Sequence, residues 1–72
     1  MNTKERRDWC MKLIEEYKLE LQQQMHVSPK GTRYTVYRPQ HVGLLAVCDG
    51  LQELEMFLNG YDAGYRAYIY NL

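Results

Sequence analysis

Residues 49–69 have the sequence DGLQELEMFLNGYDAGYRAYI, and the rest of the chain must supply a surface on which their apolar side chains can pack. Their apolar side chains recur at alternating steps of three and four, a spacing that belongs to one face of a helix and not to a strand. On a helical wheel that face spans about 120°; it carries Leu51, Leu54, Phe57, Leu58, Tyr61, Tyr65 and Tyr68. The stretch predicts an amphipathic helix, with Asp49 as its N-cap and Gln52 completing a capping-box-like pair.

The C-terminal limit of this helix has more than one interpretation. Gly60 and Gly64 together weaken a helix by about 2 kcal/mol relative to alanine. We favour a helix that runs to about Arg66. One alternative is a helix that ends near Gly60 or Gly64 and is followed by an irregular tail. Another is a short third strand at Tyr65–Tyr70.

A second helix is predicted from Thr3, which can cap it, to about Gln24. Its apolar face covers a broad arc of about 160°, with Leu19 on the far side. The residues on that face are Trp9, Cys10, Leu13, Ile14, Tyr17, Leu21 and Met25. Pro29 then stops any helix from continuing, so residues 26–32 are expected to form a connection.

Two short apolar stretches follow, and they predict a β-hairpin. Residues 33–38 form the first strand, with Tyr34 and Val36 on one face and Arg33, Thr35 and Tyr37 on the other. Residues 44–48 form the second strand, which is apolar on both faces.

Together these segments predict one α+β domain over residues 1–72: two helices packed on a short antiparallel β-hairpin in the order α-β-β-α, with a third C-terminal strand as an option. The expected core consists of Trp9, Leu13, Ile14, Tyr17, Leu21, Tyr34, Val36, Leu44, Ala46, Leu51, Leu54, Phe57, Leu58, Tyr61 and Tyr65.

Charge is balanced overall, with nine basic and nine acidic residues, which argues against a general binder of nucleic acid or anionic membranes. It is unevenly spread. Residues 25–48 contain three basic residues and no acidic one, whereas residues 49–72 contain four acidic residues against Arg66. There is no apolar signal segment and no apolar run long enough to span a bilayer, so a cytoplasmic protein with reduced thiols is expected.

The sequence offers weak material for a metal site or for catalysis. Cys10, His26, His41 and Cys48 lack the short paired spacing of zinc ligands, so we expect no metal and no cofactor. Cys48 with His41 or His26 makes a formal Cys–His pair, but catalysis also needs an orienting third group and a pocket, and the chain has almost no spare Ser, Thr or Asn to build an oxyanion hole. We therefore expect no catalytic residues. A minimal enzyme is the least favoured of three functional hypotheses.

The favoured hypothesis is a protein-binding module. Seven tyrosines, one tryptophan and a polarised charge distribution are typical of interfaces. The outer face of the hairpin is the expected contact surface, with Arg33, Thr35, Tyr37, Arg38 and Lys30 as its residues. The partner is expected to be another protein, with a homodimer as one form. The alternative is a small nucleic-acid-binding domain that uses the same basic and aromatic residues.

In its small size, its high tyrosine content and its lack of a catalytic signature, the chain resembles many short open reading frames of bacteriophages and mobile elements. Some of those encode inhibitors of host defence, including anti-CRISPR proteins. The resemblance implies an inhibitor of a host protein. It covers no specific motif and assigns no site residue.

Overall fold

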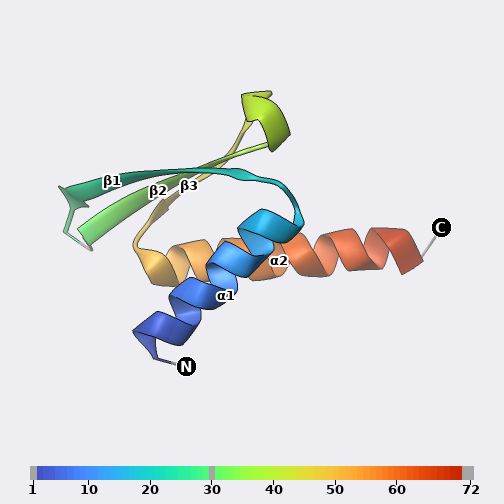
Figure 1. Cartoon of the computed structure of the whole chain (residues 1–72), viewed down its shortest axis with the longest axis horizontal. Helices are drawn as coiled ribbons and strands as arrows, with labels where there is room; N and C mark the ends of the chain where they lie inside the picture. The colour runs from blue at the N-terminus through green and yellow to red at the C-terminus, as the bar shows by residue number, and fades with distance from the viewer. Residues whose placement is uncertain (1, 30, 71–72) are drawn as a thin grey trace.

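The computed structural model describes residues 2–29 and 31–70. The elements are α1 (Thr3–Glu16), β1 (Glu20–Ser28), β2 (Gly31–Tyr37), the short 3-10 helix η1 (Pro39–His41), β3 (Leu44–Asp49) and α2 (Leu51–Tyr70). The three strands form an antiparallel sheet in chain order, and both helices lie on one side of it (Figure 1). The predicted class, two helices on a small antiparallel sheet, is confirmed.

A third strand is present, but at Glu20–Ser28 rather than at the C-terminus. The stretch 65–70 belongs instead to α2, which runs past both of its internal glycines to Tyr70. The predicted limit near Arg66 therefore ended α2 too early. The predicted helix from Thr3 to about Gln24 extended α1 too far.

The first helix ends early because the backbone turns at Lys18. Lys18 adopts a positive φ of 56°, its N–H donates to the Glu15 carbonyl at 3.1 Å, and the Leu19 N–H donates to the Ile14 carbonyl at 2.9 Å. This is the Schellman pattern that closes a helix, formed here with lysine at the position usually held by glycine. Leu19 thereby turns back into the core, where it is 6% exposed, although the wheel places it on the polar side.

The starts of the helices also differ in detail from expectation. Asn2 caps α1, accepting the Glu5 N–H on its side chain at 2.8 Å. At α2, Glu53 accepts the Asp49 N–H at 3.1 Å, while the Asp49 carboxylate is held by Arg33. Gly50, with a φ of 95°, makes the tight turn from β3 into α2.

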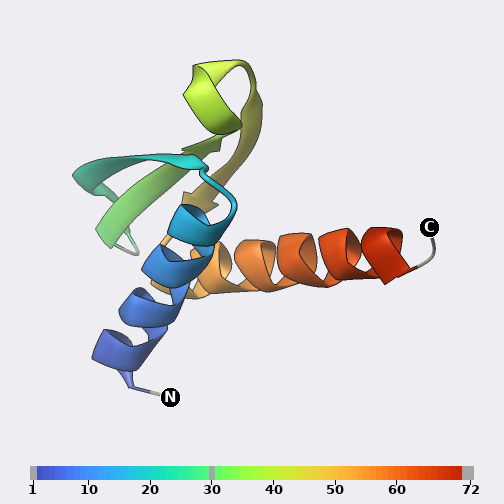
Figure 2. The same ribbon diagram turned by 45° about the vertical axis from the view of Figure 1, so that its right-hand side comes forward.

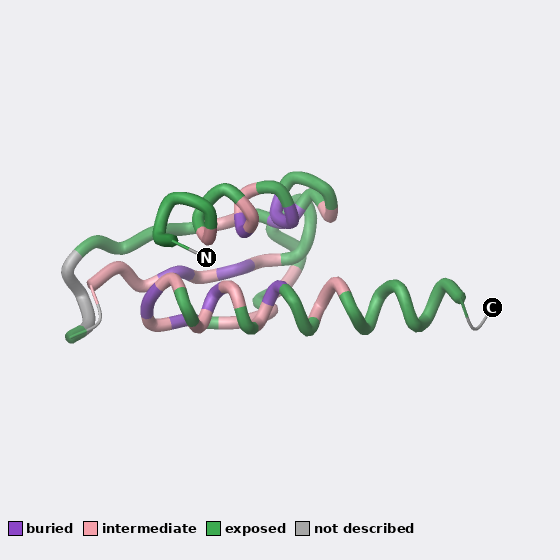
Figure 3. Tube along the Cα trace, turned by 90° about the horizontal axis from the view of Figure 1, so that it is seen from below, coloured by how far each residue is buried: buried purple, intermediate pink, exposed green. Residues whose placement is uncertain are grey.

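The core lies between the helices and the inner face of the sheet (Figure 3). Its buried members are Cys10, Leu13, Ile14, Leu19, Tyr34, Val36, Cys48, Leu54 and Leu58. Two expected core residues are exposed instead: Leu44 at 57% and Tyr65 at 47%. Leu44 turns outward because a bulge between Ala46 and Leu44 makes Leu45 the extra residue, and Leu45 packs against the core in its place.

The two helices cross at an oblique angle (Figures 1 and 2). Polar and aromatic side chains make the contacts between them. Arg6 lies 3.3 Å from a Glu55 carboxylate oxygen, and the Trp9 indole donates to the Asn59 side chain at 2.7 Å. Farther along, the Tyr17 ring lies edge-on to Tyr61 with 5.3 Å between centroids. These contacts tie α1 to α2 across most of the length of α1.

The C-terminal end of α2 extends beyond both α1 and the sheet (Figures 1 and 3). We call residues 63–70 the projecting segment. All of them are exposed, including Tyr68 at 65% and Tyr70 at 80%. Among the described residues, no helix combines the length and the apolar character that crossing a bilayer requires.

Candidate contact surfaces

The side of the sheet away from the helices carries three rows of side chains, which the strand register defines. We call it the open face. Read from β1 across β2 to β3, the rows are Gln24–Arg33–Asp49, Gln22–Thr35–Val47 and Glu20–Tyr37–Leu44. Because side chains alternate along a strand, these nine residues share one face, opposite the buried Tyr34, Val36 and Cys48.

One end of the open face is charged but internally balanced. The Arg33 Nε donates to the Asp49 carboxylate at 2.8 Å, and both side chains are between one third and one half exposed. A pair this accessible to water contributes little to stability, at most about 1 kcal/mol. It also gives this end of the sheet both a cation and an anion, so the end carries no net charge.

The opposite end of the open face is aromatic and aliphatic. The Tyr37 ring stacks on His41 with centroids 4.0 Å apart, and its hydroxyl donates to Gln22 at 3.2 Å. Leu44, opposite Tyr37 on β3, is 57% exposed, and Val47 in the next row is 54% exposed. Apolar side chains on neighbouring strands of one face form a continuous patch, and such patches are typical of contact sites.

The structure brings together three of the five residues that the sequence indicated. Arg33, Thr35 and Tyr37 lie on the open face of the central strand. Arg38 lies beyond the strand, where its side chain passes over Gly43. Lys30 is outside the described residues. Arg33 and Arg38 are separated by about 16 Å along the chain, so these two arginines do not lie side by side.

Sequence reasoning missed the contribution of the outer strands to this face. Leu44 and Val47 come from β3; Leu44 was assigned to the core, and Val47 was not included in the expected contact surface. Gln22 comes from β1, which was assigned to a helix. The alternation of Val47 with Ala46 and Cys48 places Val47 on this face once β2 is known to pair with a strand on each side.

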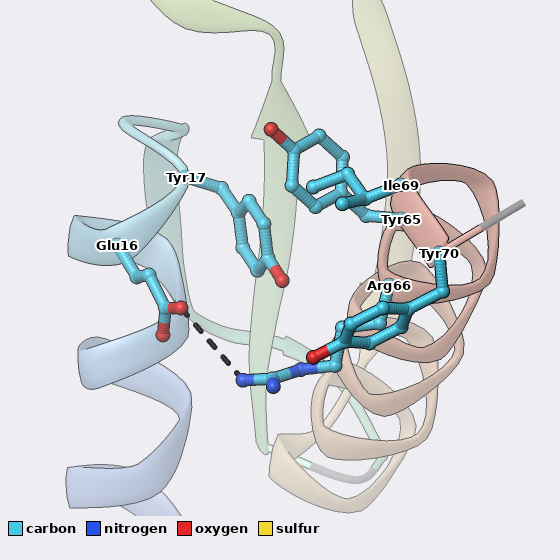
Figure 4. Close-up of a pocket in the computed structure, with 6 residues that line it drawn as sticks. All are labelled: Glu16, Tyr17, Tyr65, Arg66, Ile69 and Tyr70. Atoms are coloured by element: carbon cyan, nitrogen blue, oxygen red, sulfur yellow. Dashed lines mark ion pairs between the residues drawn. The ribbon is translucent and has the colours of Figure 1, made fainter. Parts of the chain in front are cut away.

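A small pocket of about 170 Å³ lies where the end of α1 meets the projecting segment (Figure 4). It is lined by Glu16, Tyr17, Tyr65, Arg66, Ile69 and Tyr70. The Arg66 guanidinium lies 3.1 Å from Asp62 and 3.9 Å from Glu16, so two carboxylates already neutralise it. The pocket is smaller than the roughly 300 Å³ at which small-molecule sites begin.

A wider hollow of about 590 Å³ lies at the start of α2, beside Arg6 and Met56. The first turn of a helix attracts anions. Here, however, the carboxylates of Asp49 and Glu53 also line the hollow. Their charge opposes an anionic ligand.

The thiols are buried in the core rather than at either surface. Burial raises the pKa of Cys10 to about 11 and also raises that of Cys48, which keeps both as unreactive thiols at neutral pH. Among the side chains of residues 2–25, 29 and 31–70, no group of three or more from His, Cys, Asp or Glu is arranged to hold a metal ion.

Comparison of the chain with protein-family models, with curated proteins and with solved structures gave no match.

Proposed function

We propose that the chain is a small non-catalytic protein-binding module whose contact surface is the open face of the sheet. The observation that carries the proposal is the apolar end of that face, where Tyr37, Leu44 and Val47 occupy neighbouring positions away from both helices. Tyrosine anchors flanked by aliphatic side chains and a polar rim are typical of protein interfaces.

The partner that fits this face is a folded protein with apolar side chains at the centre of its own patch. The rim supplied by Gln22, Gln24 and the Arg33–Asp49 pair offers hydrogen-bond donors and acceptors, and Glu20 adds one negative charge beside Tyr37. Binding would therefore depend mainly on apolar complementarity at Tyr37 and Val47, and Glu20 would favour a partner with a basic group at the edge of its patch.

The sharpest form of the proposal is an inhibitor that covers the working surface of a host protein. A module of 72 residues with a flat face can act by occupying a surface, which requires no deep cavity. An inhibitor carried by a bacteriophage or mobile element, of the anti-CRISPR kind, is the form of this hypothesis that the resemblance of size and composition supports.

The experiment compares two lysine substitutions at apolar side chains of similar exposure. Val47→Lys changes the open face, and Met56→Lys changes α2, where Met56 is 66% exposed. Wild type and both variants are immobilised and incubated with host lysate, and the bound proteins are quantified by mass spectrometry. We expect that wild type and Met56→Lys retain one host protein in common. Val47→Lys should retain at least ~10-fold less of it, which corresponds to a loss of about 1.4 kcal/mol of binding free energy.

Titration of that protein in purified form then gives the change in Kd directly. Tyr37→Ala should weaken the same complex, and circular dichroism should show that every variant keeps its fold. Equal retention of all bound proteins by wild type and Val47→Lys would refute the open face as the contact surface.

A further inference from the structure

We propose that the outer edge of β1 binds an extended peptide segment of another protein, which joins the sheet as a fourth strand and sets a basic side chain beside Glu20. The site is the edge of the sheet rather than its open face, and the inference does not depend on the partner proposed for that face.

The first observation is that β1 is an edge strand with a row of backbone groups to spare. Among residues 2–29 and 31–70 the strand order is β1-β2-β3, so β1 pairs with β2 on one side and with no strand on the other. Alternate residues of such a strand direct their N–H and C=O groups away from the sheet. A second extended chain satisfies these groups in a row, so the edge determines the conformation of its occupant.

The second observation is that this edge is open, whereas the opposite edge is modified. Edge strands are commonly blocked by a lysine, a proline, a bulge or a covering element. β3 has a bulge at Leu45, and α2 packs against it. The stretch Glu20–Gln24 contains no lysine and no proline, and its register with β2 changes only beyond Gln24. Its three glutamines are exposed, so β1 is the edge that can accept a further strand.

The third observation defines the side chains that the occupant should carry. Glu20 is exposed on the open face, and its carboxylate has no ion pair with any described residue. A basic side chain opposite Glu20 would form a cross-strand ion pair. Leu21 points to the other face and is half-buried against the core, so an apolar side chain opposite it would complete its cover. A segment with a basic residue next to an apolar one therefore fits.

The position of α1 argues for a segment of another protein over a second copy of this chain. Two β1 strands would pair antiparallel about a two-fold axis perpendicular to the sheet, which puts the helices of both copies on the same side. β1 begins at Glu20, shortly after α1 ends at Glu16, and α1 lies along the β1 side of the sheet (Figure 3). The α1 helices of two copies would therefore meet at the axis. A single extended segment adds to the sheet layer alone and meets no such obstacle.

The first test selects ligands for the whole chain from a displayed library of random peptides of about eight residues, within the usual length of a strand. We expect enriched peptides to carry a lysine or arginine next to an apolar residue. Glu20→Lys should weaken the tightest of them at least ~5-fold, and a peptide with glutamate in place of its basic residue should bind Glu20→Lys better than wild type. Asp8→Lys makes the same change of charge on the exposed side of α1 and should leave Kd unchanged.

Two results of that experiment would refute the site. One is the absence of any enriched peptide. The other is an equal loss of affinity in Glu20→Lys and Asp8→Lys. Val47→Lys separates this site from the open face, because it should leave peptide binding intact even where it abolishes capture of the host protein. Loss of peptide binding in Val47→Lys would show that the peptide lies on the open face instead.

Hydrogen exchange tests the backbone pairing itself. The selected peptide should protect alternate amides within Glu20–Gln24 and leave the amides of β3 unchanged. N-methylation of every second peptide residue removes the donors along one edge of the bound strand, so one of the two alternating sets should abolish binding and the other should preserve it. Tolerance of both sets would refute strand addition. Protection of the β1 amides that rises with protein concentration, without peptide, would show that a second copy occupies the edge and that the proposed occupant is wrong.

Discussion

The hydroxyl of Tyr17, the C-cap residue of α1, donates a hydrogen bond to the Asp62 carboxylate on α2, 45 residues away in the chain. Arg66 donates to the same carboxylate from one turn farther along, at 3.1 Å. The Tyr17 ring also lies edge-on to Tyr65, with 5.0 Å between centroids. Tyr17 thus fixes the direction in which the projecting segment leaves the domain.

The hydrogen bond between Tyr17 and Asp62 predicts a pH window for its stabilising effect. The bond holds the pKa of Asp62 below its ordinary 3.8 and raises the pKa of Tyr17 from 10.0 to about 12. The contribution of Asp62 to the free energy of unfolding is therefore present above the pKa that Asp62 has in the unfolded chain, and it is lost as the pH falls through the lower pKa of the folded protein. The contribution of Tyr17 is present below the pKa that Tyr17 has in the unfolded chain, and it is lost as the pH rises through the higher pKa of the folded protein.

We expect Tyr17→Phe to lower Tm by a constant amount between about pH 5 and about pH 9, and by less outside that window on either side. Thermal melts of wild type and Tyr17→Phe from acid to alkaline pH measure the difference. Tyr68→Phe removes an exposed hydroxyl from the same helix and should leave Tm unchanged. A difference for Tyr17→Phe that is the same at every pH would show that the ring, not its hydrogen bond, stabilises the fold.

Leu58→Ala should destabilise the fold severely. Leu58 is 1% exposed in the core, and truncation of a buried leucine costs about 2–5 kcal/mol, which corresponds to a fall in Tm of at least ~10 °C in a domain of this size. Phe57→Ala, at a half-buried position that the sequence assigned to the core, should cost less. Chemical denaturation of the two variants and of Met56→Ala as an exposed control measures the order. Equal losses for Leu58→Ala and Met56→Ala would contradict the packing of α2.

Lys18→Gly should stabilise the chain by about 1 kcal/mol, because lysine at a φ of 56° bears a left-handed strain that glycine avoids. Tm should rise by about 4–8 °C. Arg7→Gly, in the middle of α1, is the matched control and should destabilise by a similar amount. A fall in Tm for Lys18→Gly would show that the Schellman turn is not where α1 ends.

Both thiols should be protected from alkylation in the folded protein. Cys10 and Cys48 are 0% and 4% exposed, and burial raises the pKa of each. At pH 8 iodoacetamide should modify neither until denaturant is added, and then both. Val42→Cys places a thiol at a position that is 71% exposed and should react at once. Rapid labelling of Cys48 without denaturant would indicate local opening of β3.

The sequence predicts best where a periodic pattern is long. The apolar stripe from Leu51 to Tyr68 predicts α2 because its helical spacing continues over five turns. The strand at Arg33–Arg38 is predicted because Pro39 ends it. β1 was not predicted, because the polar run Gln22–Gln24 has no alternating pattern of its own. The end of α1 was also missed, because it is formed at Lys18 and not at a glycine, the residue that usually marks a helix end in a sequence. The strand is specified by its pairing with β2, which is a tertiary effect.

The candidate site was predictable to a similar extent. Alternation within β2 is enough to put Arg33, Thr35 and Tyr37 on one face. The neighbours that give this face its character, Asp49 beside Arg33 and Leu44 beside Tyr37, depend on a register and a bulge that local sequence does not encode. The projection of α2 beyond the sheet likewise depends on where other elements end.

The meander order of the sheet bears on how the chain folds. Each strand pairs with the one next to it in sequence, so both hairpins close short loops, whereas Trp9 meets Asn59 across 50 residues. Closing the longer loop costs more entropy, and docking of α1 onto α2 should therefore follow formation of the hairpins. Trp9 is the single tryptophan and lies at that late contact, so its fluorescence should reach the native value after the backbone signal of the sheet.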